Sequence, residues 1–107
     1  MTINIRAMGM ELTPAIRQYI EEKFTTLEKF APKALQIDVT IGKESEHHNK
    51  GNVFVCTANM DVPGELRRVE RNAKDLYKAI DKVKDHMRET LAQEKDKKIE
   101  AHRVPKK

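Results

Sequence analysis

The sequence is poor in cysteine, in aromatic residues and in long apolar runs. It has one cysteine and no tryptophan, and aromatic residues make up only 5% of its 107 positions. A lone Cys56 excludes a disulfide framework and predicts a buried free thiol in a reducing compartment. No apolar run approaches the roughly 18 residues of a membrane span, and residues 1–8 lack the apolar core of a signal peptide. We therefore expect a cytoplasmic protein with no membrane partner.

Motifs for catalysis or cofactor binding are also absent. The sequence has no phosphate-binding glycine-rich loop, no HExxH pair and no Ser-His-Asp order. His47 and His48 are neighbours in the chain, and adjacent residues rarely ligate one metal ion. We therefore expect a protein that is not an enzyme, with no metal site, no cofactor and no small-molecule substrate.

Neither sign of charge dominates the chain, but the charges are unevenly distributed. Lysine and arginine total 21 and aspartate and glutamate total 17, which gives a net charge of +4. Residues 1–63 hold 7 basic and 8 acidic side chains, whereas residues 64–107 hold 14 and 9. The basic C-terminal part indicates an anionic partner, although a solvated lysine-rich helix would have the same composition.

Hydrophobic periodicity predicts four strands. They occupy residues 3–8, 35–41, 52–60 and 65–70. The third is apolar on both faces and should be central. In the fourth, Leu66 and Val69 do not share a face by simple alternation, which leaves open a β-bulge or an error in the assigned register. Val62-Pro63-Gly64 before this strand predicts a turn. Six apolar side chains are expected to supply the sheet's share of the core: Ile3, Ile5, Leu35, Ile37, Val39 and Ile41.

Two helices are predicted from apolar positions three and four residues apart. The first begins with Thr13 as N-cap and Pro14 at the first helical position, and runs to about Phe30. The second runs from about Ala73 to the mid-90s, with Asn72 as its N-cap.

The order β-α-β-β-β-α predicts an α+β fold with two layers. A domain of residues 1–95 would form a four-stranded mixed sheet with both helices on one face. Its first two strands would be parallel because a helix connects them by a right-handed crossover. Residues 96–107 are polar and basic, and we expect them to form a disordered tail.

The predicted last helix has two polar flanks beside its apolar stripe. One flank is aromatic and basic without an acidic residue: Tyr77, Lys84, Arg88 and Lys95. The other mixes both signs, as solvated helices do: Lys74, Lys78 and Lys82 with Asp81, Asp85 and Glu89. In the first helix, Lys23 falls at the angle of the apolar stripe. It either extends to solvent from the edge of the stripe or holds its ammonium group in place for a phosphate.

Several segments resemble, in order and spacing, the family of ribosome hibernation-promoting factors and ribosome-associated inhibitors. The best match is DLYKAID at 75–81, which resembles the family's D-[ML]-Y-x-A-I-D run. LTPAIR at 12–17 and KFTTLEKF at 23–30 resemble its first helix, and residues 62–70 resemble its turn and fourth strand. The resemblance covers about residues 1–95.

This resemblance implies a fold similar to double-stranded-RNA-binding domains, without catalysis or a cofactor. It implies binding to the rRNA of the small ribosomal subunit, in the path of messenger RNA and tRNA. Translation would then be inhibited during stress or stationary phase. The chain stops at Lys107 and so resembles the short members, and we expect a monomer when it is free. The alternative is a general binding module for duplex or structured RNA.

Basic side chains on both helices are the candidate rRNA contacts. The family pattern assigns phosphate contacts to five of them, and the basic flank of the last helix and a histidine at a usual lysine position add three. The full set is Arg17, Lys23, Lys29, Lys78, Lys82, Lys84, His86 and Arg88. Glu89 replaces a usual arginine, so the sequence leaves open which flank of the last helix meets RNA. It also leaves open whether the factor dimerises ribosomes or keeps single ones inactive.

Overall fold

The sheet and its covering helices follow one another along the chain much as the periodicity predicts. The structure, a computed structural model, describes residues 1–43 and 53–103, so His47 and His48 lie outside the described residues. Within those ranges the elements are β1 (Thr2–Met8), α1 (Pro14–Thr25), a 3-10 helix η1 (Thr26–Lys29), β2 (Gln36–Lys43), β3 (Phe54–Val62), β4 (Glu65–Ala73) and α2 (Leu76–Arg103).

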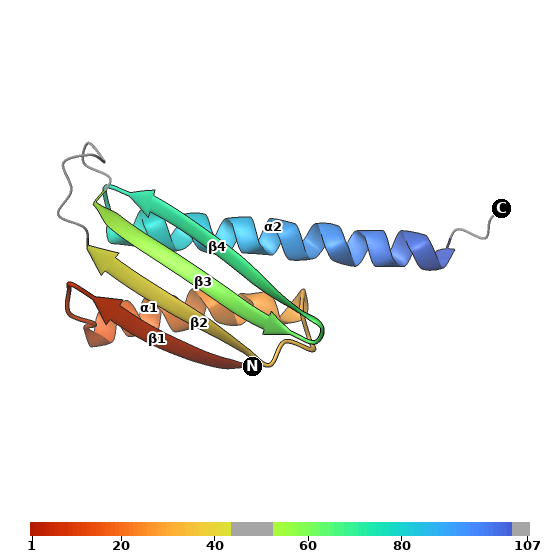
Figure 1. Ribbon diagram of the computed structural model, residues 1–107, viewed down its shortest axis with the longest axis horizontal. Coiled ribbons are helices and arrows are strands. Elements are labelled where there is room, and N and C mark those ends of the chain that lie inside the picture. Colours follow the sequence, from red (N-terminus) through yellow and green to blue (C-terminus); the bar gives the residue numbers. More distant parts are fainter. Residues whose placement is uncertain (44–52, 104–107) are drawn as a thin grey trace.

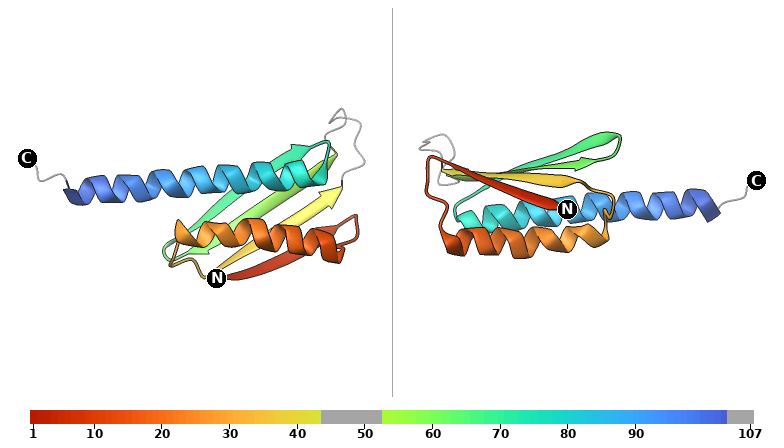
Figure 2. Two further views of the ribbon diagram at one scale, coloured as in Figure 1. Left: turned by 180° about the vertical axis from the view of Figure 1, so that it is seen from behind. Right: turned by 90° about the horizontal axis from the view of Figure 1, so that it is seen from below.

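The four strands form one mixed sheet in the order β1-β2-β3-β4 (Figure 1). β1 and β2 are parallel, as the connection through α1 requires. β2 pairs with β3, and β3 with β4, in antiparallel register. Both helices cover the same face of the sheet and run in the same direction (Figure 2). The predicted α+β class and the inner position of the third strand are therefore confirmed.

β4 is a regular strand, so of the two alternatives that the sequence left open the β-bulge is excluded. Its register with β3 is continuous from Glu65 to Ala73, after a two-residue turn in which Gly64 has a φ of 90°. A positive φ at this position favours glycine after proline, as in a type II turn. Val69 faces the helices and is 8% exposed, whereas Leu66 lies on the opposite face and is 64% exposed. The apparent conflict in the sequence arose because Leu66 is not a core residue.

The core lies between the sheet and the two helices. Ile37, Val39 and Ile41 of β2 are almost completely buried, as predicted. The prediction that Leu35 belongs to the core is wrong, because Leu35 precedes β2 and is 63% exposed. Cys56 is buried on the same face, and its burial raises the pKa of the thiol to about 12. The prediction of a buried free thiol is therefore confirmed.

Local hydrogen bonds set both ends of α1. The hydroxyl of Thr13 accepts a bond from the backbone N–H of Ile16 at 3.2 Å, which confirms the predicted N-cap. The hydroxyls of Thr25 and Thr26 donate to backbone carbonyls in the preceding turn, both at 2.6 Å. Such bonds compete with the regular helix pattern, and α1 gives way to η1 instead of continuing to about Phe30.

α2 begins and ends later than its sequence pattern indicated. Asn72 belongs to β4, and the cap is Asp75, whose carboxylate accepts from the N–H of Tyr77 at 2.9 Å. The helix then continues to Arg103, past the end of the sheet (Figure 1). Neither glycine nor proline interrupts this stretch, and Pro105 disfavours helix just beyond it. The division at residue 95 into a domain and a tail stays a prediction.

Candidate nucleic-acid interface

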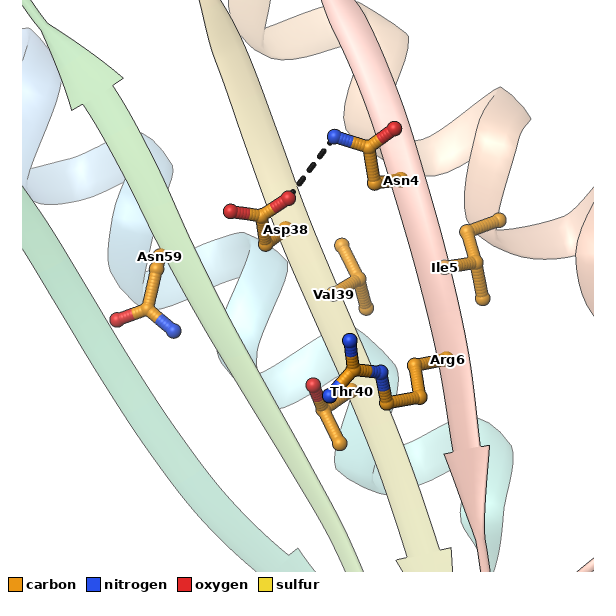
Figure 3. A pocket seen from close by; sticks show the side chains of 7 residues that line it. All are labelled: Asn4, Ile5, Arg6, Asp38, Val39, Thr40 and Asn59. Carbon is orange, nitrogen blue, oxygen red and sulfur yellow. Dashed lines mark hydrogen bonds between the residues drawn. The ribbon is translucent and has the colours of Figure 1, made fainter.

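The two faces of the sheet offer different chemistry to an RNA. The open face has a depression of about 310 Å³ across β1, β2 and β3, shown in Figure 3. Its lining contains no aromatic ring and consists of Asn4, Ile5, Arg6, Asp38, Val39, Thr40 and Asn59. The amide of Asn4 donates to the carboxylate of Asp38 at 2.9 Å (Figure 3). The lining holds one carboxylate, of Asp38, and one guanidinium, of Arg6, so it carries no excess of positive charge, and without a ring it cannot stack a base.

Farther across this open face, the charges are again of both signs. The carboxylate of Glu70 accepts from the guanidinium of Arg68 at 2.9 Å and from the hydroxyl of Thr57 at 3.1 Å. Arg68 and Glu70 thus largely neutralise one another. The layer formed by α1 and α2 is therefore the better candidate for an RNA interface.

Aromatic rings join α1 to α2 at the centre of the helical layer. The rings of Tyr19 and Tyr77 meet edge to face, with centroids 4.7 Å apart and an interplanar angle of 85°. The hydroxyl of Tyr19 donates to the carboxylate of Asp81 at 2.6 Å. This hydrogen bond, helped by burial, raises the pKa of Tyr19 to about 12. Asp81 was expected among the solvated charges of α2, and its position beside α1 corrects that prediction.

Three of the predicted basic residues lie over an aromatic ring, either that of Tyr19 or that of Phe30. The ammonium of Lys23 lies 5.3 Å from the ring centroid of Tyr19. The ammonium of Lys29 and the guanidinium of Arg88 lie 5.4 and 5.7 Å from the centroid of the Phe30 ring. These distances allow cation–π attraction. We call Lys23, Lys29 and Arg88 the interhelical cations.

Lys84 lies on the same flank of α2 but is less available. Its side chain is only 19% exposed, and its ammonium pairs with the carboxylate of Asp85 at 2.7 Å. Arg17 is exposed on α1, and six residues of helix separate it from Lys23 by about 120° around the axis. It therefore lies apart from the interhelical cations, on the flank of α1 away from Tyr19.

Other basic residues collect on the opposite flank of α2, beside β4. A guanidinium nitrogen of Arg71 lies 3.0 Å from Nδ1 of His86. The ammonium of Lys82 donates to the backbone carbonyl of Asn72 at 3.3 Å. We call Arg71 and Lys82 the strand-side cations, with His86 beside Arg71; Lys78 is exposed one turn before Lys82. The two flanks flagged by the sequence thus face different neighbours, α1 and β4.

Arg71 is the residue that sequence reasoning missed. The fourth strand was expected to end at residue 70, so the strand pattern was not extended to Arg71. In β4 the alternate residues Val69, Arg71 and Ala73 pair with β3 residues in one continuous register, and strand geometry turns all three to the helical face. The alternation of Val69 with Ala73 was the signal that could have placed Arg71 beside α2.

The described part of the chain contains no group of three or more His, Cys, Asp or Glu side chains placed to hold a metal ion. Among its helices, none is both long enough and apolar enough to cross a membrane.

Known proteins share this sequence pattern and this fold. Residues 3–99 match a family model described as Sigma 54 modulation protein / S30EA ribosomal protein. The ribosome hibernation promoting factor of Klebsiella oxytoca is 30% identical over 97 residues, which cover 91% of this chain and 96% of the relative. The protein of the same name from Escherichia coli is 29% identical with the same coverage.

The backbone of a solved structure is similar to the fold of this chain. The N-terminal domain of Protein Y from Thermus thermophilus superposes with a TM-score of 0.74 and 29% sequence identity. The match covers 87% of this chain and 98% of that domain.

Proposed function

The chain belongs to the Sigma 54 modulation protein / S30EA ribosomal protein family, and from this premise we propose that it is a hibernation factor that binds the small ribosomal subunit and inhibits translation. The family acts by binding ribosomes and is not a family of enzymes. In this proposal the free protein is a cytoplasmic monomer. It occupies the path of messenger RNA and tRNA during stress or stationary phase.

The observation that carries the proposal is the distribution of charge between the two faces. The helical layer presents the interhelical cations on one flank of α2 and the strand-side cations on the other. On the open face, Arg68 donates to the carboxylate of Glu70, and Asp38, which accepts from Asn4, adds a second negative charge. Positive charge therefore does not accumulate there. Phosphate contacts supply much of the affinity for RNA, so the helical layer is the surface that meets rRNA.

The surface fits recognition by shape better than recognition of bases. Its cations come from several elements on either side of α2, and side chains spread in this way contact backbone phosphates rather than base edges. Folded RNA is read largely through its shape and its backbone. The same property would suit a general module for duplex or structured RNA, which is the second candidate function.

A competition experiment tests the proposal. Labelled protein is bound to purified small subunits and then challenged with messenger RNA and a P-site tRNA at saturating concentration. Displacement supports occupation of the decoding path, because the two cannot be bound together. Simultaneous binding without loss of affinity would contradict occlusion. In parallel, equal affinity for small subunits and for random duplex RNA would favour the general RNA module.

A sucrose-gradient profile decides the type of hibernation. Ribosomes are sedimented with and without the protein, under conditions that stop translation. Accumulation of paired ribosomes would assign dimerisation to the factor, and accumulation of inactive single ribosomes would assign the opposite role.

A further inference from the structure

Arg71 is held in a fixed position at the boundary between β4 and α2. One of its terminal nitrogens donates to the backbone carbonyl of Glu70 at 2.6 Å, and the other lies 3.0 Å from Nδ1 of His86. Two anchored nitrogens leave the guanidinium plane little freedom. A cation that is already ordered loses less conformational entropy when a ligand binds.

The contact with Arg71 also indicates which ring nitrogen of His86 carries the proton. A guanidinium can only donate hydrogen bonds, so in this contact Nδ1 of His86 accepts and Nε2 carries the ring N–H. His86 is exposed. Its Nε2–H and the remaining N–H groups of Arg71 are thus donors at one place on the surface, which is suited to a ligand that offers only acceptors.

We infer that Arg71 and His86 form a seat for one backbone phosphate of RNA, so that strand β4 contributes to the interface together with α2. The inference rests on the proposed function and extends it to a residue outside the two helices. A guanidinium binds phosphate oxygens through paired, charge-assisted hydrogen bonds, and the Nε2–H of His86 adds a third donor. Lys82, which reaches β4 at Asn72, adds positive charge from one turn away.

Two of the acids nearest Arg71 and His86 are paired with other cations. Asp85 pairs with Lys84, on the flank that faces α1. Glu89 follows His86 by three residues and is exposed. The side chain of Glu70 accepts from Arg68 on the open face, away from His86.

Arg71→Gln in the full chain tests the seat, with Arg68→Gln as the matched control. Both changes remove one guanidinium from β4, but Arg68 points to the open face. We expect Arg71→Gln to weaken binding to purified small subunits about tenfold, the usual effect of a lost charged hydrogen bond. The slope of log affinity against log salt should become shallower by about one. Arg68→Gln should change neither, and both variants should melt at the wild-type temperature.

Each outcome bears on the seat. Wild-type binding with no effect of Arg71→Gln overturns the seat and leaves the proposed function standing. Failure of the wild type to bind small subunits overturns the proposed function itself, and the seat with it. Equal losses in both variants overturn the seat, because they indicate a response to net charge.

A second arm uses rRNA that is extracted from the small subunit and refolded. We expect Arg71→Gln to weaken binding there as well. A loss confined to intact subunits would indicate an acidic ribosomal protein as the ligand and overturn the assignment to RNA.

Discussion

The hydroxyl of Tyr19 donates to the carboxylate of Asp81 at 2.6 Å, and this bond joins α1 to α2 across 62 residues of sequence. The bond lies beside the edge-to-face contact of Tyr19 with Tyr77. Together these contacts fix how the two helices sit against each other. The spacing between Lys23 on α1 and Arg88 on α2 therefore depends on the contact between Tyr19 and Asp81.

Tyr19→Phe should destabilise the fold by about 1 kcal/mol, because it keeps the ring but removes a hydrogen bond to a charged acceptor at a partly exposed site. Chemical denaturation of both proteins at neutral pH measures the difference. Tyr77→Phe is the control, since the edge-to-face ring contact remains and the bond to Asp81 is untouched. An unchanged free energy of unfolding in Tyr19→Phe would mean that the helices are held by apolar packing alone.

The same pair should make stability fall at high pH. An unfolded tyrosine loses its proton near the ordinary pKa of 10.0, whereas the folded protein raises the pKa of Tyr19 to about 12 because of its bond to Asp81. The stabilisation is complete below about pH 10 and is lost as the pH rises from about 10 to about 12. Denaturation at several pH values should show the wild type losing its advantage over Tyr19→Phe within that window. A constant difference would contradict the linkage.

Ile37→Ala should cost roughly 2–5 kcal/mol, because it opens a cavity beneath the helices where the side chain is fully buried. Leu35→Ala removes similar atoms two residues earlier, from a side chain that is 63% exposed. It should cost less than about 0.5 kcal/mol. Comparable losses in the two variants would mean that the core extends past the start of β2.

Asp75→Ala should destabilise the protein by about 1 kcal/mol through the loss of the bond to the N–H of Tyr77. Asn72→Ala should cost less, because Asn72 lies in β4 and only its backbone carbonyl bonds to Lys82. Thermal melts of the two variants distinguish the caps. A larger effect at Asn72 would restore the cap that the sequence pattern favoured.

Charge reversal on α2 should separate binding from folding. Lys78→Glu with Lys82→Glu changes two exposed side chains, so the melting temperature should stay nearly constant. Binding to small subunits should weaken strongly, and the salt slope should become shallower by about two. Lys29→Glu with Arg88→Glu applies the same change beside α1. The pair that weakens binding more identifies the flank that lies closer to RNA.

The open face provides the control for these reversals. Arg6→Glu with Arg68→Glu changes the net charge by the same amount on the side of the sheet away from the helices. Binding to small subunits should be nearly unaffected. A loss equal to that of either α2 pair would contradict the assignment of the interface to the helical layer.

Much of the fold could be predicted because its signals are local. The alternation of Ile37, Val39 and Ile41 has the period of a strand with one buried face, and Thr13-Pro14 has the chemistry of a helix start. Burial of apolar surface drives folding, so periods of two and of 3.6 residues are sufficient to identify strands, helices and their inward faces. The same period of 3.6 residues separated the two polar flanks of the last helix from its apolar stripe.

The partners of the site residues depended on tertiary structure. Asp81 looked like a solvated charge on α2 until the packing of the helices brought it to Tyr19. Arg71 lay beyond the predicted end of its strand until the register of β4 set it against His86.

The amino-acid sequence by itself determined the α+β class, the order of the elements and the sides of α2 on which positive charge lies. Only the tertiary structure decided that one side faces α1 and the other faces β4, because strand register and helix packing arise from contacts between residues distant in sequence. Leu35 shows the same limit. Its apolar character is plain in the sequence, yet its exposure follows from where the sheet begins.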